Sequence, residues 1–317
     1  MRRLGALCVA VVMMAGSALA DGPSRENVSA AGFPATLTVP AGGADAPTVL
    51  VIAGSGPTER DGDSIVGVKA GYLALLADDL AASGIASLRY DKRGVAGSKP
   101  VAREDGLTIG SFIDDAADVF DWLAARPDAG PILVIGHSEG GVIALELARR
   151  RPSIAGLVLV ATPGRPLAET LRDQLAGYPE PLRARSLEIL AQLAAGKSVD
   201  DVPPPLLPLF RPSVQPYLRS IFALAPARTL AELRLPVLVI GGGTDLQVPR
   251  ADFDALSEAR ETVESRWFEH MNHILVDAEP DFAANIATYA RPADALSAGL
   301  AGAISGFVRQ TAASFPR

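Results

Sequence analysis

The chain has 317 residues, of which 49% are hydrophobic, and this allows one large α/β domain with a full core and room for an insertion. The net charge of −7 excludes the basic surface that a nucleic-acid-binding protein needs, so we expect no nucleic-acid partner. The single cysteine, Cys8, excludes disulfides, a thiol nucleophile and a cysteine metal site from the chain that follows it.

The first twenty residues have the pattern of a secretory signal peptide. Arg2 and Arg3 form a basic start, residues 4–15 are apolar, and residues 18–20 (ALA) form a small-residue cleavage site. A retained membrane anchor is the alternative, but the apolar run is short for a spanning helix. We therefore expect removal of residues 1–20, export to the periplasm or the extracellular space, and no membrane span in the mature chain.

The next stretch begins a sheet. Strands are expected at residues 28–31 and 35–39, on either side of a turn at residues 32–34 (GFP), and a buried strand is expected at residues 48–52. A glycine-containing loop, residues 53–63, then follows the buried strand.

This loop does not fit a dinucleotide-binding fingerprint, because Glu59 stands at the third glycine position. Its backbone favours half of an oxyanion hole, with the N–H of Ser55 or Gly56 as donor and the N–H of Glu139 as the second donor. An ordinary surface loop is the alternative. We also expect an ion pair between Arg60 and Asp61 to brace it.

Strand and helix patterns then alternate. A helix is expected at residues 72–82, a strand at 85–90 and a helix at 109–125. The loop after the strand at 85–90 contains Asp91 and Arg93, which we expect to form an ion pair that fixes a turn.

A buried strand at residues 132–135 leads directly into the sequence GHSEG at residues 136–140, and helical spacing resumes from Val142. Strand, G-x-S-x-G and helix in that order are typical of a nucleophile elbow, which raises Ser138 at the start of a helix. The alternative is a glycine-rich turn whose serine only caps the helix.

After a further strand at residues 154–161, the alternation stops. Helices are expected at residues 167–176, 182–195 and 214–223, separated by proline-rich turns. Because the segment is too long for an ordinary loop, we predict a helical cap, residues 164–234, inserted between two parts of a core at residues 21–163 and 235–317. Such a cap would exclude water and shape a substrate pocket.

The sheet pattern returns at residues 237–240 and 262–269, with a helix at 251–259 between them and a helical C-terminus from residue 281, broken at Pro292. The predicted fold class is therefore α/β, with a mostly parallel central sheet flanked by helices.

Three side chains stand at the carboxyl ends of predicted strands, in the chain order Ser138, Asp245, His273. A serine hydroxyl is a weak nucleophile, a histidine can take its proton and return it to the leaving group, and a carboxylate can orient that histidine. We predict that Ser138, Asp245 and His273 are catalytic.

Other residues compete for two of these roles. His270 is the alternative base, at the end of the preceding strand. His137 lies inside the elbow, and we expect it to be packed in the interior. Asp252 and Asp254 are the alternative acids, but they lie in a predicted helix, where we expect solvated side chains.

Four motifs resemble those of the bacterial α/β-hydrolase serine carboxylesterases of the EstD type. They are residues 53–62 (AGSGPTERDG), 88–94 (LRYDKRG), 136–140 (GHSEG) and 272–273 (NH). The resemblance covers nearly all of the chain after residue 20. It implies an α/β-hydrolase fold, with Ser138 as nucleophile, Asp245 as acid, His273 as base, and the backbone N–H groups of Ser55 and Glu139 as the oxyanion hole. In one departure, members often have a histidine that braces the oxyanion loop where this chain has Ala53.

The leading hypothesis is a serine hydrolase that cleaves small-molecule carboxylic esters through an acyl-enzyme, with no metal and no organic cofactor. A peptidase or amidase on the same residues is the first alternative, and Glu139 or the acidic residues of the cap could then bind a substrate amine. A thioesterase and a non-catalytic binding protein are the others. The sequence leaves the natural ester and the oligomeric state open.

Overall fold

The computed structural model describes residues 22–43, 46–98, 100–101 and 103–315. The predicted signal peptide at residues 1–20, with Cys8, lies outside the described residues. Within those ranges, no helix combines the length and the apolar character that crossing a bilayer requires.

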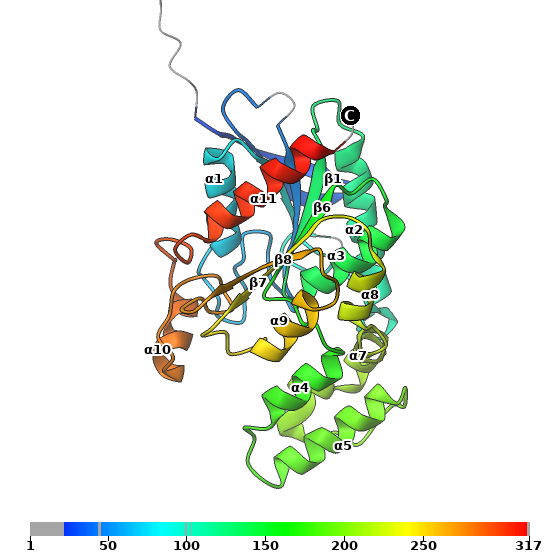
Figure 1. Cartoon of the computed structure of the whole chain (residues 1–317). Coiled ribbons are helices and arrows are strands. Elements are labelled where there is room, and N and C mark those ends of the chain that lie inside the picture. The colour runs from blue at the N-terminus through cyan, green and yellow to red at the C-terminus, as the bar shows by residue number, and fades with distance from the viewer. Residues whose placement is uncertain (1–21, 44–45, 99, 102, 316–317) are drawn as a thin grey trace, which may run out of the picture.

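An eight-stranded sheet runs through the molecule (Figure 1). Its strands are β1 (Ser24–Ala30), β2 (Phe33–Val39), β3 (Thr48–Ile52), β4 (Ala86–Tyr90), β5 (Ile132–His137), β6 (Gly156–Val160), β7 (Val237–Gly242) and β8 (Val263–Phe268). They lie in the order β1-β2-β4-β3-β5-β6-β7-β8. The pairs β1–β2 and β2–β4 are antiparallel, and the remaining neighbours are parallel. The predicted mostly parallel sheet is confirmed.

Helices cover both faces of this sheet, which explains why the central strands β3, β5, β6 and β7 are buried along their whole length. Helices α1 (Tyr72–Ala82) and α11 (Leu300–Ser314) pack on one face. Helices α2 (Ile109–Ala124), α3 (Glu139–Arg150), α8 (Pro226–Glu232) and α9 (Arg250–Ser257) pack on the other (Figure 1).

The first hairpin turns earlier than the sequence predicted. Its turn residues are Ala31 and Gly32, with φ of 51° and 85°, as in a two-residue turn that matches the twist of the strands. Phe33 and Pro34, predicted to lie in the turn, belong to β2. The Phe33 side chain is fully buried against Tyr90, with ring centroids 5.9 Å apart, and this burial draws it into the strand.

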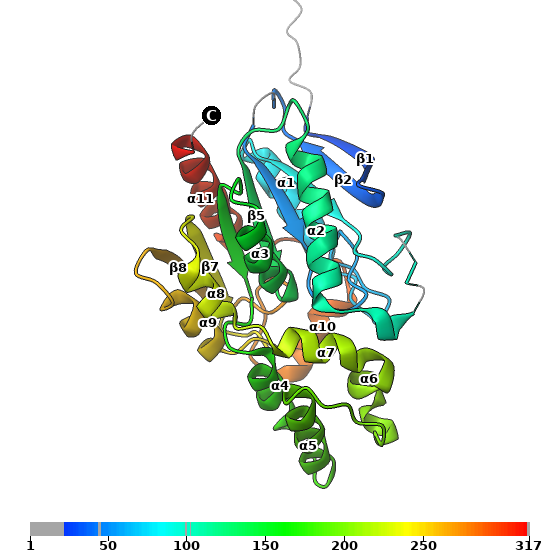
Figure 2. The ribbon, with the colours of Figure 1, turned by 90° about the vertical axis from the view of Figure 1, so that its right-hand side faces the viewer.

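The segment between β6 and β7 contains helices and no strand among its residues, all of which are described. Its helices are α4 (Leu167–Leu175), α5 (Leu182–Ala194), α6 (Leu207–Phe210), α7 (Gln215–Phe222) and α8, and its short 3₁₀ turns are η2 (Pro204–Leu206) and η3 (Pro212–Val214). Figure 2 shows α4 to α7 gathered at one end of the sheet. The three predicted helices lie within a residue of their observed bounds, whereas α6 and α8 were not predicted.

Buried Asp252 of α9 joins this segment to the core, so the prediction that Asp252 is solvated is wrong. Its carboxylate accepts hydrogen bonds from the backbone N–H groups of Gly164 and Arg165 at 3.1 and 2.9 Å and from the hydroxyl of Thr170 at 3.0 Å. The Arg165 guanidinium adds an ion pair at 2.8 Å. These donors stabilise a charge that burial alone would disfavour. Asp254, in contrast, is half-exposed and pairs with Arg250 of its own helix at 2.7 Å.

Candidate active site

The turn from β5 into α3 has the strand–turn–helix arrangement that the sequence predicted. Ser138 occupies it with φ 55° and ψ −124°, a strained conformation for a residue with a side chain. A Cβ on Gly136 would collide with the backbone of Gly140 and Gly141, and a Cβ on Gly140 would collide with the carbonyl oxygen of Ile52. Glycine at these two positions is therefore what permits so tight a turn.

Asp245 and His273 meet at the carboxyl ends of β7 and β8. The imidazole Nδ1 of His273 lies 2.9 and 3.1 Å from the two carboxylate oxygens of Asp245. The side chain of His273 is 6% exposed and that of Asp245 is 1% exposed. One carboxylate oxygen also accepts the backbone N–H groups of Gln247 and Val248, at 2.7 and 3.0 Å.

This environment sets the ionisation of Asp245. Burial opposes the charged carboxylate, but attraction to His273, the hydrogen bond to its ring and the two backbone N–H groups outweigh burial and lower the pKa of Asp245 below its ordinary value. The carboxylate is therefore charged wherever a neutral-pH hydrolase would work, and it can hold the His273 ring with Nδ1 protonated and Nε2 free.

His137 is packed in the interior, as predicted, and it also holds the main chain of His273. Its Nε2 lies 2.8 Å from the carbonyl oxygen of His273, and its Nδ1 lies 3.2 Å from the hydroxyl of Tyr72. The neutral tautomer with a proton on Nε2 satisfies both contacts, since Tyr72 can then donate to Nδ1. The two imidazole centroids are 4.8 Å apart, so the residue before Ser138 adjoins His273 directly.

Burial, with the neighbouring His273 as the next cause, lowers the pKa of His137 to about 3. In the unfolded chain a histidine has a pKa of about 6.5. Between these values the unfolded chain binds a proton that the folded chain does not, so the free energy of unfolding should fall with decreasing pH by up to about 1.4 kcal/mol per unit.

Denaturant titrations between pH 7 and the acid limit of folding would measure this slope in the wild type and in His137→Gln. We expect a shallower slope in the variant, because it has no imidazole to protonate on unfolding. Equal slopes in the two proteins would contradict the assignment.

The alternative base is not part of this arrangement. The His270 side chain is exposed, and its carbonyl oxygen accepts the hydroxyl of Thr244 at 2.8 Å. The alternative acids in α9 do not contact His273 either. Asp252 pairs with Arg165 and Asp254 pairs with Arg250, whereas Asp245 contacts His273.

The loop after β3 lies against the elbow. A Cβ on Gly54 would stand 3.1 Å from the Cβ of Ser138. Within the described part of the chain, the backbone N–H groups of Ser55 and Glu139 donate to no protein acceptor. Two free donors beside a serine are what an oxyanion hole requires.

Two side chains that sequence reasoning missed surround these donors. The buried ammonium group of Lys92 donates a hydrogen bond to the carbonyl oxygen of Gly54 and lies 3.5 Å from the Glu139 carboxylate. The hydroxyl of Tyr217, on α7, donates to the other oxygen of that carboxylate. Burial, together with the adjacent Glu139, raises the pKa of Tyr217 well above its ordinary value and keeps the phenol protonated. Lys92 stood inside the quoted LRYDKRG motif, and that was its only signal in the sequence.

Both predicted ion pairs between sequence neighbours are wrong. Arg60 pairs with Asp91 at 2.8 Å, and Asp61 pairs with Arg89 at 2.9 Å. Arg93 pairs instead with Asp115 of α2, through its Nε at 2.5 Å. The loop after β3 is thus held to β4 and its following loop rather than by a bond within itself.

Two buried asparagines also escaped sequence reasoning, although Asn272 stands in the quoted NH motif. Asn285, in helix α10 (Phe282–Ala287), donates to the carbonyl oxygen of Thr244 at 2.8 Å and accepts from the Asn272 side chain at 3.2 Å. Both asparagines are fully buried. Helix α10 thereby ties the loop that carries Asp245 to the loop that carries His273.

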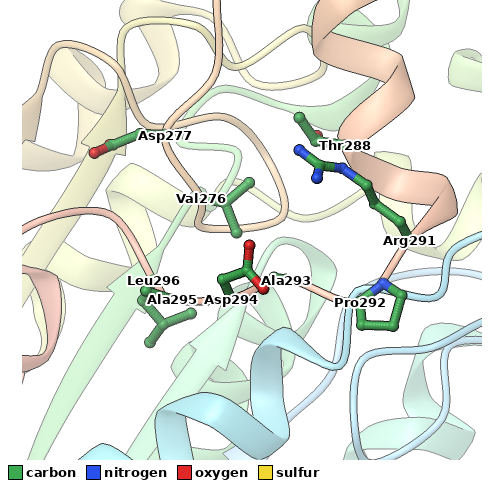
Figure 3. Close-up of a pocket in the computed structure, with 9 residues that line it drawn as sticks. All are labelled: Val276, Asp277, Thr288, Arg291, Pro292, Ala293, Asp294, Ala295 and Leu296. Atoms are coloured by element: carbon green, nitrogen blue, oxygen red, sulfur yellow. The ribbon is translucent and has the colours of Figure 1, made fainter.

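A pocket of about 230 Å³ opens beside the His273 loop (Figure 3). Val276, Asp277, Arg291 and Asp294 are among the residues that line it, and none of Ser138, Asp245 and His273 is. No group of three or more His, Cys, Asp or Glu side chains able to hold a metal ion occurs in the ranges that the structure covers.

The chain matches a protein family and a curated relative. Residues 66–281 match the family described as serine aminopeptidase, S33. Esterase EstD of Thermotoga maritima is 30% identical over 261 residues, which cover 80% of this chain and 61% of EstD, so the chain spans about three fifths of that relative.

Among solved structures, Est1E from Butyrivibrio proteoclasticus with ferulic acid bound has a TM-score of 0.61 at 17% identity, over 91% of this chain and all of Est1E. Proline iminopeptidase from Mycobacterium smegmatis has a TM-score of 0.57 at 20% identity, over 92% and 99% of the two chains. At such identities these structures speak for the fold alone, and the fold they share with this chain is the one that the motifs implied.

Proposed function

We propose that this chain, which belongs to the serine aminopeptidase S33 family of α/β-hydrolases, cleaves small-molecule carboxylic esters by an acyl-enzyme mechanism. The observation that carries the proposal is the buried hydrogen bond between Asp245 and His273, at 2.9 Å, beside the tight turn that presents Ser138. The similarity to the esterase EstD, which covers 80% of this chain and 61% of EstD, supports the choice of ester chemistry.

In the proposed mechanism, Ser138 attacks the ester carbonyl while His273 takes the hydroxyl proton at Nε2. Asp245 holds the ring through Nδ1 and stabilises the imidazolium. The carbonyl oxygen becomes an oxyanion, which the N–H groups of Ser55 and Glu139 bind. His273 then gives its proton to the leaving alcohol. In the second half of the reaction a water molecule attacks the acyl-enzyme while His273 takes the proton of that water, and His273 returns the proton to the Ser138 oxygen as the acid leaves. None of these steps needs a cofactor.

The peptidase alternative has less support at Glu139, one of the acids expected to bind a substrate amine. Lys92 and Tyr217 already occupy both oxygens of that carboxylate. An amine would have to displace a buried lysine to bind there, at the cost of leaving that lysine unpaired. A thioester would use the same residues as an ester and differs only in its leaving group.

The helices between β6 and β7 are proposed to act as a cap, residues 164–234, on a core formed by residues 21–163 and 235–317. Tyr217 of α7 supports this, because its hydroxyl reaches the residue that follows Ser138. Export to the periplasm or the extracellular space is also proposed, and it rests on the signal-like pattern of residues 1–20.

The test compares matched p-nitrophenyl esters and p-nitroanilides of increasing acyl length as substrates. We expect a higher kcat/KM for each ester than for its anilide, and a stoichiometric fluorophosphonate adduct on the peptide that contains Ser138. Faster cleavage of aminoacyl anilides than of esters would replace the esterase proposal with the peptidase. If the folded protein shows no turnover of any substrate and forms no adduct, the esterase and the peptidase proposals are both overturned.

A further inference from the structure

Lys92 touches both halves of the proposed oxyanion hole. Its ammonium group donates to the carbonyl oxygen of Gly54 and lies 3.5 Å from a carboxylate oxygen of Glu139. The first partner belongs to the residue before Ser55, and the second partner is the side chain of the other proposed donor. Lys92 itself comes from the loop after β4, so it links three separate segments.

The planar geometry of the peptide bond links the Gly54 carbonyl, which Lys92 contacts, to the Ser55 N–H. The carbonyl of Gly54 and the N–H of Ser55 belong to one planar trans peptide unit, in which they point in opposite directions. A hydrogen bond that holds the carbonyl toward Lys92 therefore also fixes the direction of the Ser55 N–H. Rotation of this peptide unit would turn the donor away from the oxyanion.

The contact with Glu139 acts on the second donor. Glu139 is the first residue of α3, directly after the strained Ser138, and its side chain is 9% exposed. Lys92 holds one oxygen of the carboxylate and Tyr217 holds the other. These two bonds restrain the residue whose N–H faces the same oxyanion.

The burial of the Lys92 side chain indicates that this residue has a role besides stabilising the fold. Its side chain is 2% exposed, and its ammonium lies 5.7 Å from the centroid of the Phe112 ring. An isolated ammonium in such surroundings is costly, and a buried ion pair is often no more stable than apolar side chains of similar volume. An apolar residue would fill the space at lower cost, but it could not hold the carbonyl oxygen of Gly54.

We propose that Lys92 is a positioning residue that orients the Ser55 N–H toward the oxyanion and, through Glu139, restrains the second donor. It touches neither substrate nor the reacting atoms. The inference rests on the proposed function for its chemistry, while the contacts that carry it do not depend on the ester chosen. Electrostatic stabilisation works only if the donors are oriented before charge develops, and the Lys92 contact supplies that orientation.

The test is a double-mutant cycle of wild type, Lys92→Met, Glu139→Gln and Lys92→Met/Glu139→Gln. Met removes the charge and donor at similar length. Lys92→Met alone leaves the Glu139 carboxylate buried without its cation, so lost activity there could reflect misfolding. The double variant removes both charges and avoids that ambiguity, and thermal unfolding checks that all four proteins are folded.

We expect Lys92→Met to lower kcat by about 10²-fold, the scale of losing one oxyanion donor, with little change in KM. The same loss should persist in the Glu139→Gln background. A trifluoromethyl ketone, whose adduct with serine places an oxyanion in the hole, should bind more weakly by a similar factor.

Two results would overturn the inference. One is a cost of less than about threefold for Lys92→Met in the Glu139→Gln background, which would assign the loss to the unpaired carboxylate. The other is an effect on KM alone, which would make Lys92 a substrate-binding residue.

Failure of the proposed function would be recognised separately. If the wild type cleaves no ester but is labelled by a fluorophosphonate, the labelling rate replaces kcat, because the phosphonyl oxygen enters the same hole. We then expect the same slowing in Lys92→Met in both backgrounds. If the wild type shows neither turnover nor labelling, both proposals are overturned.

Discussion

Ser138→Ala should remove ester turnover, with kcat lower by about 10⁴-fold or more, because alanine has no hydroxyl that could form the acyl-enzyme. The measurement is the hydrolysis of the best p-nitrophenyl ester, alongside fluorophosphonate labelling followed by intact mass. The variant should fold like the wild type, since alanine removes one oxygen atom from a side chain that forms no hydrogen bond to the described residues.

The control for this variant is Ser314→Ala. Ser314 is an exposed serine at the end of α11, and its replacement should leave both turnover and labelling within about twofold of the wild type. Turnover by Ser138→Ala above about 1% of the wild type would assign the nucleophile elsewhere.

His273→Ala should lower kcat/KM by about 10⁴-fold, because Ser138 would lose the base that takes its proton and the acid that protonates the leaving group. His270→Ala is the matched control. It removes an exposed imidazole three residues earlier, and we expect kcat/KM within about twofold of the wild type.

The two histidine variants decide between the bases that the sequence left open. A large loss in His270→Ala with activity kept in His273→Ala would contradict the assignment of the base. Added imidazole gives a further check, since it can supply the missing base to His273→Ala and should restore part of the rate there but not in Ser138→Ala.

The parts of the fold that were predicted correctly depend on local patterns. The bounds of α1 were predicted to the residue, and those of α2 to within one, because a 3.6-residue spacing of apolar side chains is visible in any short window. The parallel strands were recognised as short β-branched runs. The first hairpin was misplaced, since whether Phe33 belongs to a turn or a strand depends on the distant ring of Tyr90.

In the candidate site, too, the residues predicted from the sequence are those that local patterns indicate. Ser138 was predicted from GHSEG between a strand and a helix, and that motif carries its own geometry, because Gly136 and Gly140 allow a turn that no side chain would permit. Asp245 and His273 were predicted from their places at the ends of strands, and parallel strands bring those ends to one edge of the sheet. The sequence determined the turn at Ser138 because neighbouring residues alone specify it.

Only the tertiary structure decided the partners of the charged side chains. Arg60 and Asp61 lie in a turn of the loop after β3, and they pair with Asp91 and Arg89 rather than with each other. The contact of Lys92 with Gly54 spans 38 positions, and no spacing in the sequence indicates it. Such contacts form where packing excludes water and each buried polar group must find a partner, whatever its distance along the chain.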